Sequence, residues 1–138
     1  MKDRLAVMAL ALWWGSLTAL AGFVVPMLFA NLPSPALAGN VAGKLFSVQN
    51  WVSLACGLSV LLIYAKNQDL PSAKRPYDAI GLIALSMLSA LVIEFGVSPR
   101  ILARDQLKLW HTAGSVLYAV QWLCVGLLLW RATRQPAS

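Results

Sequence analysis

Charged residues are scarce in this chain, and histidine and cysteine are scarcer still. Charged residues make up 12% of the 138 residues and hydrophobic residues 59%, whereas about a quarter of a soluble globular domain is charged. One histidine and two cysteines, Cys56 and Cys124, both inside apolar runs, do not supply the clustered ligands of a zinc or haem site. The mean hydropathy of +0.71 predicts a membrane protein. Because histidine and cysteine are so scarce, we expect this protein to have no metal site and no cofactor.

Four apolar segments make up most of the chain: Leu5–Ala30, Leu45–Ala65, Ala79–Val97 and Leu109–Trp130. Each is close to the ~20 residues that cross a ~30 Å hydrocarbon core, and a backbone in lipid satisfies its own hydrogen bonds as a helix. The sequence therefore predicts one all-α domain over residues 1–138. We expect a four-helix transmembrane bundle with helices at about 5–30, 35–65, 78–97 and 99–131.

Two Ser-Pro pairs set the expected starts of the second and fourth helices. A serine hydroxyl caps free N–H groups and proline suits the first helical position, so these helices should begin at Pro35 and Pro99. The stretches "SPALAGNVAGKLF" and "SPRILARDQLKLW" share Ser-Pro, Lys-Leu and an aromatic residue at a constant offset of 64. This pattern favours two parallel helical-hairpin repeats; shared helix-start chemistry is the alternative.

Basic residues are divided unevenly between the two ends of such a bundle. Because basic residues are enriched in cytoplasmic loops, we expect a protein of the bacterial inner membrane with both termini on the cytoplasmic side. The basic residues stand between the apolar runs, where they meet lipid head groups, so nucleic acid is not an expected partner. Seven of the eleven lie at the end that holds both termini: Lys2, Arg4, Lys66, Lys74, Arg75, Arg131 and Arg134.

Small residues form a face near the start of the second helix. Gly39 and Gly43 are four residues apart, with Ala38 and Ala42 alongside, and such a face lets another helix approach closely. The alternative is that these residues serve the packing of the bundle itself.

With no nucleotide loop or nucleophile elbow in the sequence, we expect a non-catalytic accessory or scaffolding subunit. Its partners would be the lipid bilayer and another membrane protein or a second copy.

A carboxylate, Glu94, stands near the end of the third apolar run, and the only histidine, His111, stands at the start of the fourth. Both lie about one helical turn from the expected membrane boundary, and polar residues within a membrane usually face protein or water. We therefore expect Glu94 and His111 to lie together at this end of the bundle; an ion pair of Glu94 with Arg100 or Lys108 is the alternative. The second functional hypothesis is a binder or conduit for a small solute or ion. Its site would be a polar cluster of Glu94, His111, Lys44, Gln49, Asn50, Arg100 and Ser115.

Several stretches resemble one membrane-protein family over nearly the whole chain. They are "VVPMLFANLPSPALAGNVAGKLF", the "SPR" at Ser98–Arg100 and the "WHTAGS" at Trp110–Ser115. They are similar to the bacterial branch of the family named after mammalian transmembrane protein 205, whose bacterial members carry only a domain of unknown function. The resemblance implies four transmembrane helices and no established activity. That family favours a neutral polar residue such as Asn at the position of Glu94, so the carboxylate departs from its pattern.

Overall fold

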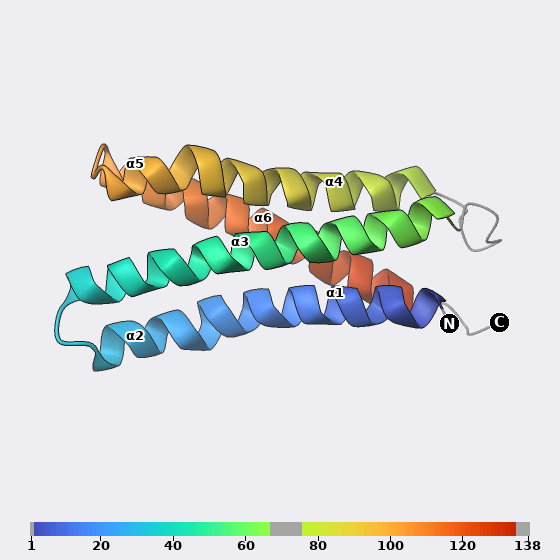
Figure 1. Ribbon diagram of the computed structural model, residues 1–138, viewed down its shortest axis with the longest axis horizontal. Helices are drawn as coiled ribbons and strands as arrows, with labels where there is room; N and C mark the ends of the chain where they lie inside the picture. Colours follow the sequence, from blue (N-terminus) through green and yellow to red (C-terminus); the bar gives the residue numbers. More distant parts are fainter. Residues whose placement is uncertain (1, 67–75, 135–138) are drawn as a thin grey trace.

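The computed structural model describes residues 2–66 and 76–134, so the expected cytoplasmic Lys74 and Arg75 lie outside the described residues. All regular elements in those two ranges are helical (Figure 1). The first crossing is α1 (Lys2–Ala19), the π-helical turn η1 (Leu20–Val24) and α2 (Val25–Asn31), and α3 (Pro35–Lys66) is the second. The third is α4 (Pro76–Val92), the π-helical turn η2 (Ile93–Val97) and α5 (Ser98–Leu102), and α6 (Leu107–Arg134) is the fourth.

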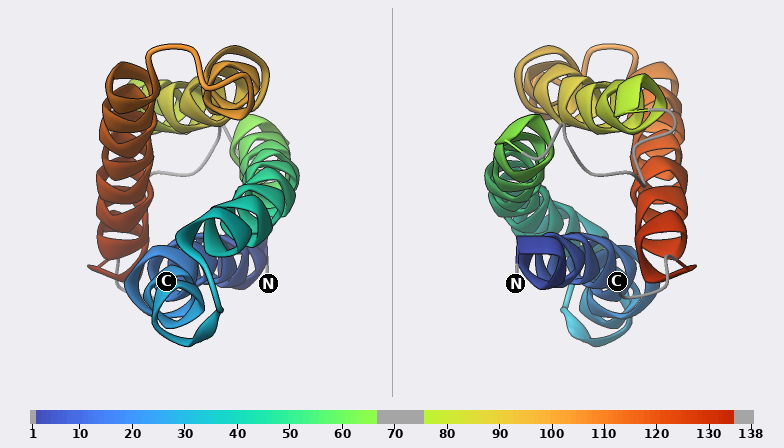
Figure 2. Two further views of the ribbon diagram at one scale, coloured as in Figure 1. Left: turned by 90° about the vertical axis from the view of Figure 1, so that its left-hand side faces the viewer. Right: turned by 90° about the vertical axis from the view of Figure 1, so that its right-hand side faces the viewer.

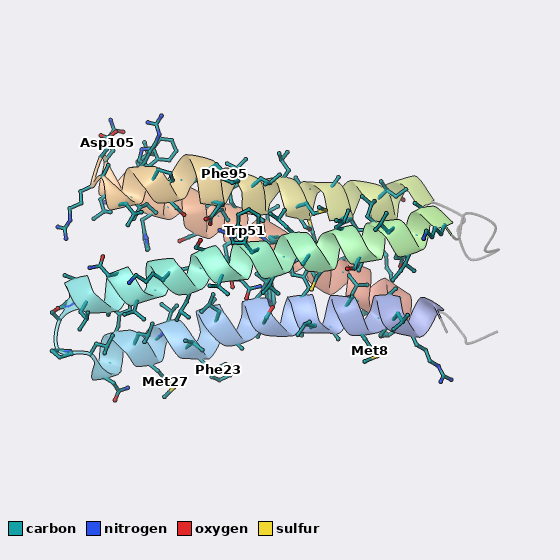
Figure 3. The ribbon with its side chains drawn as sticks, in the orientation of Figure 1. Met8, Phe23, Met27, Trp51, Phe95 and Asp105 are labelled. Atoms are coloured by element: carbon teal, nitrogen blue, oxygen red, sulfur yellow. The ribbon has the colours of Figure 1, made fainter. Side chains whose placement is uncertain are left out.

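The four crossings are long and apolar enough to span a membrane: Arg4–Asn31, Pro35–Lys66, Asp78–Leu102 and Leu107–Arg134. The predicted all-α four-helix bundle is therefore confirmed, and the chain is a multi-pass membrane protein. We call the end with the α2–α3 and α5–α6 connections the hairpin end, and the opposite one the terminal end. Large apolar side chains such as Met8, Phe23 and Met27 point outward from the bundle, as lipid contact requires (Figure 3).

The crossings form a closed ring. The first and third crossings each pack against both α3 and α6, and the views along the bundle show this arrangement (Figure 2). Because lipid is as apolar as the bundle core, close packing and interhelical hydrogen bonds hold such helices together. The core contains the fully buried Trp13 and, around it, Leu10, Leu17, Val60, Ile83, Val125 and Leu128.

Each of the two interrupted crossings carries a π-helical turn followed by a proline. Pro26 follows η1, and Pro99 follows η2. A proline inside a helix lacks the N–H of one hydrogen bond and its ring clashes with the preceding turn. A wider turn just before the proline relieves that clash. Both prolines therefore lie within helical crossings and do not end them.

The expected start of the fourth helix at Pro99 is wrong. The third crossing runs on through α5 to Leu102, beyond the expected end at residue 97, and α6 begins at Leu107. The backbone stays α-helical at Ser98 (φ −58°, ψ −44°), whereas Leu32, before Pro33, is extended (φ −85°, ψ 149°). Only the first hairpin therefore turns at a proline. The second turns where Arg104 and Gln106 have positive φ values of 55° and 41°.

The second helix does begin at Pro35, and the Ser34 hydroxyl accepts a hydrogen bond from the Leu37 N–H at 3.2 Å. A repeat is present in the order of elements, but the offset of 64 is wrong. The π-helical turns begin at residues 20 and 93, which are 73 apart, and the two halves run in the same direction (Figure 1). On the return helices, "LFSVQ" at 45–49 matches "LYAVQ" at 117–121 at an offset of 72.

Candidate functional site

Glu94 lies on η2 and faces α3. The Ser47 hydroxyl donates a hydrogen bond to Glu94 Oε1 at 2.6 Å, and Asn50 Nδ2 donates one to Glu94 Oε2 at 2.9 Å. Ser47 and Asn50 are three residues apart on α3, a spacing that places both donors on one helix face. Asn50 is 2% exposed, and Glu94 and Ser47 are half-buried. Both carboxylate oxygens are thus held by neutral donors. We call these three residues the Glu94 cluster.

His111 is not among the hydrogen-bond partners of Glu94 in the described part of the chain. It is exposed on α6, and its backbone carbonyl accepts a hydrogen bond from the Ser115 hydroxyl at 2.9 Å. Ser115 is also exposed. The structure therefore does not join these two residues to the carboxylate, although they are near the same end of the bundle.

The two predicted cationic members of the site also lie apart from Glu94. Lys44 is exposed on α3. Arg100 is exposed on α5, where its guanidinium lies 4.5 Å from the centroid of the Trp110 ring. An exposed cation over an aromatic ring near the membrane boundary is an interfacial contact. Of the seven residues predicted for the polar cluster, Glu94 and Asn50 are hydrogen-bonded to each other in the described part of the chain.

Gln49, the remaining predicted member, belongs to a separate polar chain at the bundle centre. Its Nε2 donates to the Ser16 hydroxyl at 3.0 Å and, more weakly, to Ser53 Oγ at 3.5 Å. Ser53 Oγ in turn donates to Gln121 Oε1 at 2.7 Å, which also accepts from Trp13 Nε1 at 3.3 Å. These bonds connect α1, α3 and α6. We call Ser16, Gln49, Ser53, Gln121 and Trp13 the glutamine chain.

The contact between α1 and α6 contains stacked aromatic side chains, whereas the contact between α3 and η2 contains the carboxylate of Glu94. Trp14 and Trp122 stack with ring centroids 5.5 Å apart, and Trp122 Nε1 donates to the Thr18 hydroxyl at 2.8 Å. At the repeat offset of 73, the first-half counterpart of Glu94 is Ala21. The carboxylate is thus specific to the second half of the chain and is not required by the repeated fold.

The predicted small-residue face is divided between two environments. Ala38 and Ala42 are buried within the bundle, as the internal-packing alternative expects. Gly39 and Gly43 are exposed, and a Cβ atom added at either would meet nothing within 4 Å. The helix backbone is therefore bare and exposed on α3 at two successive turns.

The described residues contain no group of three or more His, Cys, Asp or Glu side chains that could hold a metal ion together. A surface hollow at the hairpin end is lined by Gln106, Lys108 and Thr112 and does not include Glu94. What the Glu94 cluster offers is a carboxylate, a hydroxyl and a carboxamide. Such groups bind a charge and do not by themselves supply an activated nucleophile.

Sequence reasoning missed Ser47 and Gln121. Ser47 continues the stripe of Gly39, Gly43 and Asn50 at helical spacing, so this periodicity could have identified it. Gln121 is a carboxamide in the middle of an apolar run, and the match of "LFSVQ" to "LYAVQ" pairs it with Gln49. Both signals depend on comparing helix faces across the whole chain.

The profile of a family described as a domain of unknown function (DUF4149) matches residues 8–108. No curated protein and no solved structure matches the chain. The match identifies an uncharacterised family, and the resemblance to the transmembrane-protein-205 family stays a prediction.

Proposed function

Since the chain belongs to the DUF4149 family, whose function is unknown, we propose its role from its own geometry. It is a non-catalytic accessory or scaffolding subunit that packs against another membrane protein. The observation that carries this proposal is the exposed pair Gly39 and Gly43 on α3. Association in lipid depends on close van der Waals packing, and a bare helix backbone permits the closest approach.

A photo-crosslinking amino acid placed at Gly43 should form a protein adduct in native membranes. The same amino acid at Leu58, which is exposed on the same helix, should label lipid. Adding Gly39→Leu should abolish the protein adduct without unfolding the chain, because a side chain there meets nothing within 4 Å of its Cβ in the bundle. Mass spectrometry of the adducts provides the measurement. Lipid adducts alone at both positions would contradict the proposal.

We further propose that both termini are cytoplasmic and that the membrane is a bacterial inner membrane. Support comes from the excess of basic residues at the terminal end, such as Arg4, Lys66 and Arg131. In intact cells, a membrane-impermeant maleimide should label Asp105→Cys, between α5 and α6, and should not label Lys66→Cys. The native Cys56 and Cys124 are buried and give little background. Labelling of Lys66→Cys alone would reverse the orientation.

A second candidate function, a binder of a small solute or ion, is favoured by one observation. The Glu94 cluster places a carboxylate within the span Asp78–Leu102 and holds both its oxygens in fixed hydrogen bonds. Ionisable residues within membrane spans are costly and often mark ion or solute sites.

A further inference from the structure

The charge of Glu94 is not balanced by a side chain in the described part of the molecule. Its partners, Ser47 and Asn50, are neutral. The basic groups at the hairpin end of the elements packed around η2 are Lys44 on α3, Arg100 on α5, and Lys108 and His111 on α6; all are exposed. A charge within a membrane span is unfavourable unless a counter-charge or water accompanies it. The cluster therefore has the character of a site for a positive ion.

The backbone at Glu94 offers a further oxygen. In an α- or π-helix, the donor to the Glu94 carbonyl would be the N–H group four or five residues further on, at Ser98 or at residue 99. The N–H of Ser98 bonds to the carbonyl of Ile93, and proline has no N–H. The π-helical turn and the proline thus deprive the Glu94 carbonyl of both of these donors. Carbonyls freed at helix interruptions are ligands for Na⁺ in membrane proteins.

The equivalent turn in the first half separates what the fold requires from what the site adds. There the Val25 N–H bonds to the Leu20 carbonyl and Pro26 follows, so the carbonyl of Ala21 loses the same two donors. A methyl group stands there instead of a carboxylate. The backbone interruption belongs to both halves, whereas the combination with a carboxylate and two polar neighbours occurs only at η2.

The number of charges selects the kind of ion. One carboxylate and one monovalent cation sum to zero, so the occupied site would be neutral, as a membrane interior favours; a divalent ion would leave a net positive charge. The Ser47 hydroxyl can turn its proton away and present lone pairs, and Asn50 has a carbonyl oxygen besides its amide group. Oxygen ligands suit hard cations, while sulfur and imidazole suit softer metals.

An aromatic pair stands next to the cluster on the same two elements. Trp51 follows Asn50 on α3 and Phe95 follows Glu94 on η2, and their rings meet edge-on with centroids 6.4 Å apart (Figure 3). This contact spans the same two elements as the cluster. Both rings are exposed on the surface of the bundle, so the aromatic pair lies on the lipid-facing side of these two elements.

We propose that Glu94, Ser47 and Asn50 form a binding site for a small monovalent metal cation of the size of Na⁺. This inference specifies the second candidate function and is independent of the scaffolding role. The bound ion would draw the Glu94 carboxylate and the α3 hydroxyl and carboxamide together across the α3–η2 seam, so binding should stabilise the bundle.

Dicyclohexylcarbodiimide, an apolar carboxyl reagent, tests the site in the purified full-length chain in detergent. The carboxyl oxygen bonds to the central carbon of the reagent, the carboxyl proton passes to a reagent nitrogen, and an acyl shift to nitrogen leaves a stable adduct detected by mass spectrometry. Labelling of Glu94 should be about tenfold slower in NaCl at ten times the dissociation constant than in choline chloride of equal ionic strength, because only the cation-free fraction reacts.

Matched variants decide whether the effect arises at this site. Glu94→Gln should remove the adduct, and Asp105→Asn, the same chemical change at an exposed residue, should leave Na⁺ protection unchanged. Ser47→Ala should still be labelled but should need more Na⁺ for protection. Equal labelling rates in NaCl, LiCl and choline chloride would overturn the proposal. So would Na⁺ protection that is unchanged in both Ser47→Ala and Asn50→Ala.

Thermal unfolding provides a second measurement that does not depend on access of the reagent. NaCl should raise the Tm of the parent relative to choline chloride and should not do so in Glu94→Gln. No Na⁺-dependent rise in the parent would reject the site, while an intact protein adduct at Gly43 would leave the scaffolding role standing. The reverse pair of results would retain the ion site and reject the scaffold.

Discussion

Replacing Gly57 by alanine should destabilise the bundle by about 1–3 kcal/mol, the usual cost of extra volume in a packed core. A Cβ at this position on α3 would stand 2.6 Å from Met87 Cγ, 2.9 Å from Met87 Sδ and 3.1 Å from the Trp13 ring. Met87 can move, since it is flexible. Trp13 is completely buried and cannot shift without disturbing its neighbours. The free energy of unfolding in mixed micelles, followed by tryptophan fluorescence, gives the measurement.

Gly39→Ala is the matched control for this change, since it adds the same methyl group to the same helix. Nothing lies within 4 Å of the added Cβ there, and alanine is favoured over glycine in a helix by about 0.5–1 kcal/mol. We expect Gly39→Ala to be neutral or slightly stabilising in the isolated chain. Equal destabilisation by both substitutions would contradict the assignment of the Gly57→Ala effect to the Met87 and Trp13 contacts, because helix propensity favours alanine at both positions.

Trp13→Ala should have the largest effect of any single substitution considered, a loss of about 3–5 kcal/mol. Trp13 is completely buried in the core, and its Nε1 donates to Gln121 Oε1 at 3.3 Å. Lipid does not fill a cavity enclosed by four helices, so the van der Waals contacts of the indole ring are lost. The measurement is again unfolding in mixed micelles, here read by circular dichroism because a tryptophan is removed.

Two further tryptophan variants separate packing from hydrogen bonding. Trp13→Phe keeps most of the ring and loses the bond to Gln121, so it should cost about 1 kcal/mol for the hydrogen bond plus a smaller packing loss. Trp130→Ala removes an exposed ring that contacts Arg134 and should change stability by less than about 1 kcal/mol. A Trp130→Ala loss as large as that of Trp13→Ala would contradict the burial argument.

Local chemistry in the sequence was sufficient for the helices themselves. Four apolar runs of membrane length determine four crossings, because a chain in lipid has to satisfy its backbone hydrogen bonds internally. The start of α3 at Pro35 also follows from local chemistry, since Ser34 caps the helix and the preceding Leu32 is extended. Helical spacing also places Gln49, Ser53 and Cys56 on one face of α3, and the structure buries that face.

The same local chemistry failed at Ser98-Pro99, where an almost identical signal has a different outcome. A proline ends or starts a helix when the residue before it is extended, but the π-helical turn η2 accommodates Pro99 inside the third crossing. The decision depends on whether the preceding residues pack as a continuous helix against α3 and α6. That is a property of the assembled ring. The expected offset of 64 pairs Pro35 with Pro99, whereas in the structure the proline equivalent to Pro99 is Pro26.

The sequence by itself determined that a carboxylate at residue 94 would stand within a membrane span. Only the tertiary structure decided its partners. Chain proximity favoured His111 on the next crossing, whereas the ring places η2 against α3 as well as α6 and turns Glu94 toward Ser47 and Asn50. The direction of a side chain depends on the rotation of its helix, and the packing of all four crossings sets that rotation. The depth of a residue in the membrane depends only on its position along its own crossing.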